Sequence, residues 1–269
     1  EHVRKEGIKI QENGEDVIYH PQAVTSTEGL EPVDLVILFV KSLFSRAALS
    51  GNKGLIGPDT YVMTLQNGSG HEDILGEFVG QDHIVIGTTE DNGAVLGLGH
   101  IRRGGEGNTN VGMLVEDKDG FLPKLKEAFD CCGFNVKIHA NIQQLIWNKL
   151  FTNVSLSAVT GILQVDMGYI ASNEHAWAMT RRLIKEAVAV AHAMGLEADE
   201  EAIAAKVRKT SEMSPGGCTS IRADLRDGRK SEVDTISGSV VRAAAKVGVP
   251  VPCHEFVVNM VHALEGKNA

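Results

Sequence analysis

The chain changes character near residue 140, and this change constrains its architecture more than any other feature. Before residue 140, short apolar runs alternate with helical stretches and are separated by Gly, Pro and Asn. Strands that alternate with helices favour a mostly parallel, doubly wound sheet. After residue 140 the strand pattern disappears and helical periodicity continues to the end. We therefore predict an α/β domain at 1–139 and an all-helical domain at 140–269.

The α/β part contains apolar runs that we interpret as strands. The clearest, 34–40 (DLVILFV), is a continuous run that predicts a strand buried on both faces. The runs 94–101 and 109–114 are expected to pair around the glycine-rich stretch 104–108. The other predicted strands are 60–65, 83–88 and 134–138, and the predicted helices are 42–50, 71–79, 118–131, 141–165, 174–194, 200–213, 220–226, 233–247 and 253–265.

The composition excludes several classes of function. With 35 acidic and 26 basic residues, the net charge of −9 argues against general binding to nucleic acid or anionic membranes. No uncharged apolar run reaches the roughly 18 residues of a spanning helix, and the first residues lack the apolar segment of a signal peptide. The 4 Cys form no C-x-x-C and the 10 His no H-x-x-x-H, so we expect neither a disulfide framework nor a catalytic metal. Together these features predict a cytoplasmic protein.

The segment 141–165 carries a single charge, Lys149, which predicts a helix buried on most sides. Lys149, Asn153 and Ser157 are spaced four apart and share one face, and Thr160 lies within about 20° of the Lys149 direction. A lone lysine beside neutral hydrogen-bonding residues is a candidate wall of a polar cleft, where desolvation would lower its pKa toward acid–base work. The same pattern also fits a lysine that extends to solvent beside Asn and Ser that satisfy backbone groups.

A second candidate is the sequence SEVD at 231–234. Glu232 is a candidate site carboxylate, but the same residues also fit a helix start. In that interpretation Ser231 is the N-cap, Asp234 completes a capping arrangement, and Glu232 lies at the positive end of the helix. The basic residues just upstream form either a solvated face or a cluster that steers an anionic substrate; they are Arg222, Arg226, Arg229 and Lys230.

A third candidate lies where two predicted strands end. Lys41 directly follows the strand at 34–40, and Gln66-Asn67-Gly68 directly follows the strand at 60–65. In open parallel sheets, ligands bind outside the carboxyl ends of the strands. The stretch 67–70 (NGSG) also fits ordinary tight-turn chemistry.

Taken together, these stretches resemble the ketopantoate reductases (2-dehydropantoate 2-reductases), NADPH-dependent enzymes of pantothenate synthesis. The resemblance covers essentially the whole chain. It is carried by VK at 40–41, QNG at 66–68, the stretch 87–112, WNKLFTNVSLSAVTGI at 147–162, TSIRADLRDGRKSEVDTISG at 219–238 and GVPVP at 248–252. It implies a Rossmann-like, mostly parallel sheet that is N-terminally incomplete, followed by an all-α substrate and dimerisation domain. The implied reaction is NADPH-dependent reduction of a 2-oxo acid, ketopantoate above all.

The resemblance also implies roles for particular residues. Lys149 would be the general acid that protonates the C2 carbonyl oxygen as hydride arrives. Glu232 would hold the substrate hydroxyl and order the cleft, and Asn67 would bridge substrate and nicotinamide ribose. The remaining substrate contacts would be Asn153, Ser157 and Ser220, and the cofactor would lie along Lys41, Asn67, Gly93 and Glu232.

The sequence departs from the family pattern in two places. The family opens with a strand and a G-x-G-x-x-G turn that holds the pyrophosphate at a helix N-terminus, and this motif does not occur in the chain. We hypothesise that about the first βαβ unit is deleted or lies outside this sequence; a molecule that truly lacks it should lose cofactor affinity. Ser157 stands where the family usually has Asn, so a different branched or larger 2-oxo acid is an alternative substrate.

Two alternatives to a ketopantoate reductase stay open. One is another 2-hydroxy acid dehydrogenase of the same two-domain architecture. The other is a truncated, non-catalytic protein that keeps the helical domain for association or ligand sensing. For the quaternary structure, the largely apolar helices after residue 170 favour a homodimer.

Overall fold

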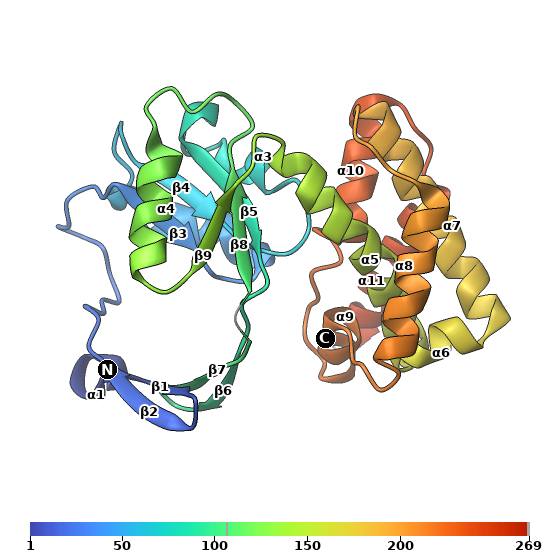
Figure 1. The fold of residues 1–269 in the computed structure, drawn as a ribbon, viewed down its shortest axis with the longest axis horizontal. Coiled ribbons are helices and arrows are strands. Elements are labelled where there is room, and N and C mark those ends of the chain that lie inside the picture. The colour runs from blue at the N-terminus through green and yellow to red at the C-terminus, as the bar shows by residue number, and fades with distance from the viewer. Residues whose placement is uncertain (106, 268–269) are drawn as a thin grey trace. The chain divides into compact units, whose positions relative to one another are not determined.

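The computed structural model describes residues 1–105 and 107–267 and divides into two compact units (Figure 1). The first unit comprises Glu1–Phe39, Ser45–Leu65 and Leu75–Ile142. The second comprises Val40–Phe44, Gln66–Ile74 and the chain from Gln143 onward. The segments that directly follow two strands of the first unit therefore belong to the helical unit. The functional division at 139/140 remains a prediction.

The first unit is built on a five-stranded sheet, in the order β3-β4-β5-β8-β9. Neighbouring strands run parallel except for β5 and β8, which are antiparallel. The mostly parallel sheet is therefore confirmed. The strands are β3 (Leu35–Leu38), β4 (Tyr61–Thr64), β5 (Ile84–Thr89), β8 (Asn108–Gly112) and β9 (Asn135–Ile138). The helices in this part of the sequence are α2 (Ser45–Gly51), α3 (His71–Leu75) and α4 (Phe121–Cys131), with short 3-10 turns at Ser42–Phe44, Lys53–Leu55 and Gln81–His83.

The core of this sheet forms where α4 packs on its central strands. Leu122 and Leu125 of α4 join buried side chains of β4, β5, β8 and β9 in one cluster. The rings of Phe121 and Tyr61 stack with their centroids 3.5 Å apart. Strand β3 differs from its prediction, because Leu35–Ile37 are only half-buried. The reason is that β3 is an edge strand among the described residues.

A second, four-stranded sheet in the first unit, in the order β2-β1-β7-β6, departs from the sequence prediction. It contains β1 (Ile8–Glu12), β2 (Glu15–Tyr19), β6 (Gly93–Gly97) and β7 (His100–Arg103), and it follows helix α1 (His2–Glu6). The predicted strand 94–101 is in fact a hairpin, because Gly99 adopts a positive φ of 65° and turns the chain. The expected pairing of 94–101 with 109–114 is therefore wrong: β8 pairs with β5 and β9.

The second unit is all-helical beyond residue 142, as predicted. Its helices are α5 (Ile142–Leu163), α6 (Met167–Ser172), α7 (Glu174–Ala193), α8 (Glu200–Met213), α9 (Ser220–Arg226), α10 (Ser237–Val247) and α11 (Pro252–Lys267). Helix α6 was not predicted, and α10 begins at Ser237 and not at 233. The core is built around α5, whose Trp147, Leu150, Phe151 and Val154 are almost fully buried.

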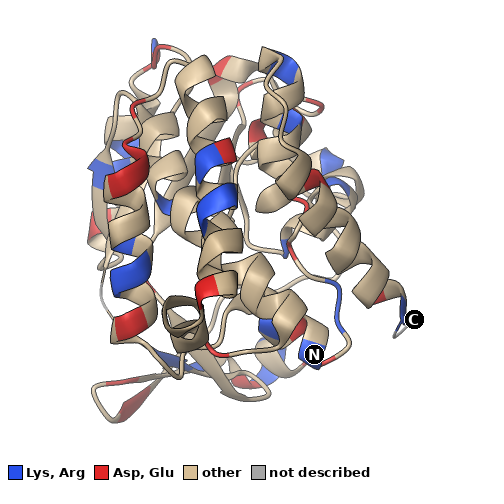
Figure 2. Ribbon diagram, turned by 90° about the vertical axis from the view of Figure 1, so that its right-hand side faces the viewer, with Lys and Arg blue, Asp and Glu red and all other residues tan. Residues whose placement is uncertain are grey.

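Residues of both signs of charge lie along the helices (Figure 2). Lys and Arg alternate with Asp and Glu along the ribbons that face the viewer in Figure 2. Within residues 1–105 and 107–267, no helix combines the length and the apolarity that crossing a bilayer requires.

Candidate functional site

Helix α5 presents a buried polar face. Lys149 and Asn153 are half-buried, while Ser157 and Thr160 are 5% and 0% exposed. The prediction of a helix buried on most sides is thus confirmed, and the polar residues share one face at the predicted spacing. These polar groups form one stripe that α5 offers to a ligand or to neighbouring polar elements.

Helix α9 begins against this polar face. The hydroxyls of Thr160 and Thr219 are 2.7 Å apart, and Thr219 caps α9 by accepting a hydrogen bond from the Arg222 N–H. The approach depends on Gly161, because a Cβ there would lie 2.7 Å from the Ile221 side chain. Ser220 is the first residue of α9 and is exposed. The predicted substrate residue Ser220 is therefore placed beside the end of the α5 polar face.

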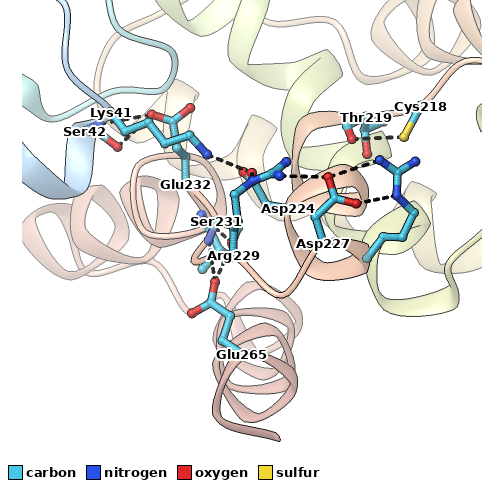
Figure 3. A network of polar contacts seen from close by, with 12 residues as sticks. Lys41, Ser42, Cys218, Thr219, Asp224, Asp227, Arg229, Ser231, Glu232 and Glu265 are labelled. Carbon is cyan, nitrogen blue, oxygen red and sulfur yellow. Dashed lines mark hydrogen bonds and ion pairs between the residues drawn. The ribbon is translucent and has the colours of Figure 1, made fainter. Parts of the chain in front are cut away.

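One turn further along α9, Asp224 gathers two cations. Its side chain is only 6% exposed, and Oδ1 accepts hydrogen bonds from Lys41 Nζ at 2.8 Å and Arg229 Nε at 3.0 Å (Figure 3). The hydrogen bond to Asp224 raises the pKa of Arg229. A carboxylate this deeply buried needs such partners, because burying it without them would be costly. Asp224 is not among the predicted site residues, although its four-residue spacing from Ser220 was a usable signal.

Glu232 is anchored to the segment that carries Lys41. Its Oε1 accepts hydrogen bonds from the Ser42 backbone N–H at 3.2 Å and from the Ser42 hydroxyl at 3.0 Å (Figure 3). The helix-start interpretation of SEVD is wrong, because α10 starts at Ser237 with Ile236 as its N-cap. The Ser231 N–H and hydroxyl donate to Glu265 at 2.8 and 2.7 Å. The carboxylate of Glu232 is thus fixed by a residue distant in sequence and does not cap α10.

The predicted QNG turn lies against the residues that follow Glu232. Gly68 has φ +99°, and a Cβ at this position would lie 2.6 Å from the Thr235 carbonyl carbon, so only glycine fits. The Ser69 N–H donates to the Thr235 carbonyl at 3.0 Å. Asn67 itself is exposed. The side chain of His71 contacts the Asn67 carbonyl oxygen, with Nε2 at 3.0 Å.

These contacts form a closed circuit within the second unit. It runs from α5 through α9 to Lys41 and Ser42, then to Glu232 and Thr235, and on to the turn at 66–70. The circuit closes on α5 through Gln143, whose Nε2 donates to Glu72 at 3.3 Å. Seven predicted site residues lie on the elements of this circuit: Lys41, Asn67, Lys149, Asn153, Ser157, Ser220 and Glu232. Gly93 lies on β6 in the first unit, and its assignment to the cofactor stays a prediction.

Most of the upstream basic cluster is neutralised by carboxylates. Arg222 pairs with Asp166, Arg226 with Asp227, and Arg229 with both Asp224 and Asp227. The hydrogen bond between Arg226 and Asp227 raises the pKa of the arginine and lowers that of the carboxyl. These arginines therefore act mainly as structural ion pairs around α9, which weakens the hypothesis that they steer an anionic substrate.

The linked elements carry an ammonium, a carboxylate and neutral hydrogen-bond donors. This set can bind a small oxygen-rich anion and exchange a proton with it. Within the described residues, no three His, Cys, Asp or Glu side chains gather in a way that could hold a metal ion.

Two family models match the sequence. The model described as "Ketopantoate reductase PanE/ApbA" matches residues 1–116, and "Ketopantoate reductase PanE/ApbA C terminal" matches residues 141–265. Among curated proteins, the 2-dehydropantoate 2-reductase of Halobacterium salinarum is 28% identical, with 96% of this chain and 85% of the relative covered. The enzyme of the same name from Lactococcus lactis is 29% identical, with 98% and 86% covered.

Solved structures with the same fold include two that bear on chemistry. A ternary structure of D-mandelate dehydrogenase with NADH and anilino(oxo)acetate has a TM-score of 0.87 and 29% identity, covering 99% of this chain and 87% of that one. The putative 2-dehydropantoate 2-reductase from Enterococcus faecalis has a TM-score of 0.82 and 26% identity, with 99% and 87% covered.

Proposed function

Because the chain belongs to the ketopantoate reductase family, we propose that it reduces ketopantoate to pantoate with NADPH as the hydride donor. The chain is an oxidoreductase, and its named relatives support a 2-oxo acid as its substrate class. The observation that carries the proposal is the closed circuit of contacts in the second unit. It brings the elements that bear Lys149, Glu232 and Asn67 into one polar region.

Part of this region fits the nicotinamide end of the cofactor. Lys41 has an ammonium on a side chain that is 43% exposed and is held in place by Asp224, and Asn67 presents an exposed amide on a fixed turn. These groups would hold ribose hydroxyls and the carboxamide by hydrogen bonds. When bound, the cofactor would supply the hydride.

The residues of the chain then account for binding and proton transfer. The Lys149 ammonium donates its proton to the C2 oxygen as negative charge develops there. The Glu232 carboxylate accepts a hydrogen bond from a substrate hydroxyl, and its contact with Ser42 keeps that acceptor in a fixed direction. Asn153 and Ser220 bind the remaining polar groups of the substrate. Since neighbouring residues of α5 are packed in the core, the backbone that carries Lys149 is held in place.

A panel of 2-oxo acids tests this assignment. NADPH oxidation, followed by absorbance, should give the highest kcat/KM with ketopantoate among acids of different size and branching. NADH in place of NADPH should lower kcat/KM. Equal rates across the panel would remove ketopantoate as the specific substrate, and no oxidation with any acid would remove the proposed reaction.

The second candidate function is an NADH-dependent 2-hydroxy acid dehydrogenase with another substrate. Two observations favour it: the similarity to a D-mandelate dehydrogenase solved with NADH and anilino(oxo)acetate, and Ser157, which is shorter than the Asn usual in the family. Ser157→Asn separates the candidates. In a ketopantoate reductase it should leave kcat/KM for ketopantoate within about tenfold, whereas in the alternative it should lower kcat/KM for bulky acids such as phenylglyoxylate.

We also propose that the protein is a cytoplasmic homodimer. An apolar cavity of about 810 Å³ lies among α5, α7 and α11 in the second unit. Leu163, Met179 and Phe256 line it and are exposed, as expected of a surface that a second copy covers. Sedimentation equilibrium should give twice the 28.9 kDa chain mass, and Phe256→Asp should shift it toward the monomer. A single-chain mass for the wild type would contradict the dimer.

A further inference from the structure

His71 is a buried polar residue next to the QNG turn. It is 5% exposed and is the first residue of α3. Its ring has one recorded hydrogen bond, between Nε2 and the carbonyl oxygen of Asn67 at 3.0 Å. Among the residues that the structure describes, Nδ1 is buried and has no hydrogen-bond partner. Among the described residues, the buried ring therefore makes its side-chain hydrogen bond to the Asn67 carbonyl oxygen through Nε2.

The chemistry of the ring fixes the direction of this hydrogen bond. A carbonyl oxygen can only accept, so Nε2 must carry the proton and donate it. Burial lowers the pKa of His71, although the bond to Asn67 and the charges of Glu72 and Glu232 act in the opposite direction and Arg242 acts with burial. The neutral ring protonated at Nε2 avoids burying a charge and still donates a hydrogen bond to the Asn67 carbonyl oxygen.

Asn67 is held by two contacts that do not involve its own side chain. His71 holds its carbonyl group, and the residue after it, Gly68, lies against the Thr235 backbone. Asn67 is exposed, and the contacts that hold the turn do not involve its side-chain amide. The backbone from which this amide projects is thus fixed by His71 at the Asn67 carbonyl and by Thr235 at Gly68.

We propose that His71 is a positioning residue that sets the orientation of the Asn67 amide toward substrate and nicotinamide ribose. The inference rests on the proposed function, since it assigns His71 a part in the site that Asn67 serves. His71 acts through the Asn67 backbone and touches neither reactant. A donor at the position of Nε2 is required, and a donor elsewhere on the side chain does not replace it.

Three substitutions separate this role from general stabilisation. The amide nitrogen of Gln takes the place of Nε2, whereas that of Asn takes the place of Nδ1. His71→Gln should therefore keep kcat/KM for the 2-oxo acid within about threefold of the wild type, while His71→Asn and His71→Leu should lower it about tenfold, as expected for one lost hydrogen bond. Circular dichroism and thermal unfolding establish that each variant is folded at the assay temperature.

The chain contains a matched control. His254 is fully buried, its Nε2 lies 3.0 Å from the Leu183 carbonyl oxygen, and its Nδ1 has no partner among the described residues. It repeats the environment of His71 on α11, outside the circuit of contacts that forms the site. His254→Asn should lower the melting temperature as His71→Asn does and leave kcat/KM of the folded enzyme unchanged.

A double-mutant cycle with Asn67→Ala decides the mechanism. If His71 acts through the Asn67 amide, His71→Asn should have no further effect on kcat/KM in the Asn67→Ala background. Additive effects of the two substitutions, or equal kcat/KM for His71→Asn and His71→Gln, would overturn the positioning role. Wild-type protein without reductase activity on any 2-oxo acid would instead overturn the proposed function, so the two failures are distinguishable.

Discussion

Substituting Gly68 by Ala probes the contact between the QNG turn and the Glu232 segment. A Cβ on Gly68 would lie 2.6 Å from the Thr235 carbonyl carbon, whereas ordinary contacts begin at 3.4 Å. The same Cβ would come still closer to the Thr235 carbonyl oxygen, so the turn must retreat by at least about 1 Å, and the hydrogen bond from the Ser69 N–H to Thr235 is lost or lengthened. Ala must also adopt a positive φ, which costs about 1–2 kcal/mol. With about 1 kcal/mol for the hydrogen bond, the free energy of unfolding should fall by about 2–3 kcal/mol.

The effect on catalysis should be larger than the effect on stability suggests. Moving Asn67 by about 1 Å relative to Glu232 should lower kcat/KM roughly 100-fold, because misplacement of that size disrupts the orientation of reacting groups. Steady-state NADPH oxidation and urea unfolding measure the two quantities. Gly54→Ala is the control, because Gly54 has no positive φ and a Cβ there meets no atom within 4 Å. If Gly68→Ala matched Gly54→Ala in both assays, the turn would not be packed on Thr235 as described.

Three further predictions follow from the same contacts. Asp224→Asn removes the charge that holds Lys41, so the KM for the nicotinamide cofactor should rise roughly tenfold; an unchanged cofactor KM would show that the ion pair does not serve the site. Ser220→Ala should raise the KM for the 2-oxo acid several-fold with kcat unchanged, because its hydroxyl would bind ground and transition states equally; a fall in kcat alone would contradict this. Burial lowers the pKa of His71 and His254 from the ordinary value of a histidine, so below about pH 6.5 the unfolded chain binds protons that the folded chain does not, and the free energy of unfolding should decrease as the pH is lowered. Urea unfolding at pH 7 and pH 5 should show a shallower fall for His254→Gln than for the wild type, and equal slopes would contradict it.

The helices of the second unit could be predicted well because residues at or next to their ends determine where most of them begin and end. Asp199 and Thr219 cap α8 and α9 with their side chains, and both helices begin and end where the sequence predicts. The apolar character of 141–165 likewise predicted a buried helix, since an exposed helix of this length would need more charge. Helix α6 was missed because its six residues are too short to show a clear periodicity.

The site could be predicted only in part, because its contacts join distant segments. The sequence identified Lys149, Asn67 and Glu232 as site candidates. The contact between Lys41 and Asp224 spans 183 positions, and no local pattern encodes it. The start of α10 was misplaced for the same reason. Ser231 and Glu232 look like a helix cap, yet their partners are Glu265 and Ser42.

The small sheet of the first unit was missed because its strands lack the signals of a buried sheet. Strand β2 is exposed along its whole length and β1 is half-buried, so neither shows the alternation that half-buried strands usually carry. The turn at Gly99 lies inside an apolar run that also contains Gly97, and this run predicted a continuous strand.

The turnover of Lys149→Met with ketopantoate and saturating NADPH tests the central claim most directly. Methionine keeps much of the length and the packing of the side chain but cannot donate a proton. If the ammonium is the general acid, kcat should fall by roughly two to four orders of magnitude, while the dissociation constant for NADPH, measured by fluorescence titration, stays near the wild-type value. A variant that turns over ketopantoate at the wild-type rate would contradict the account.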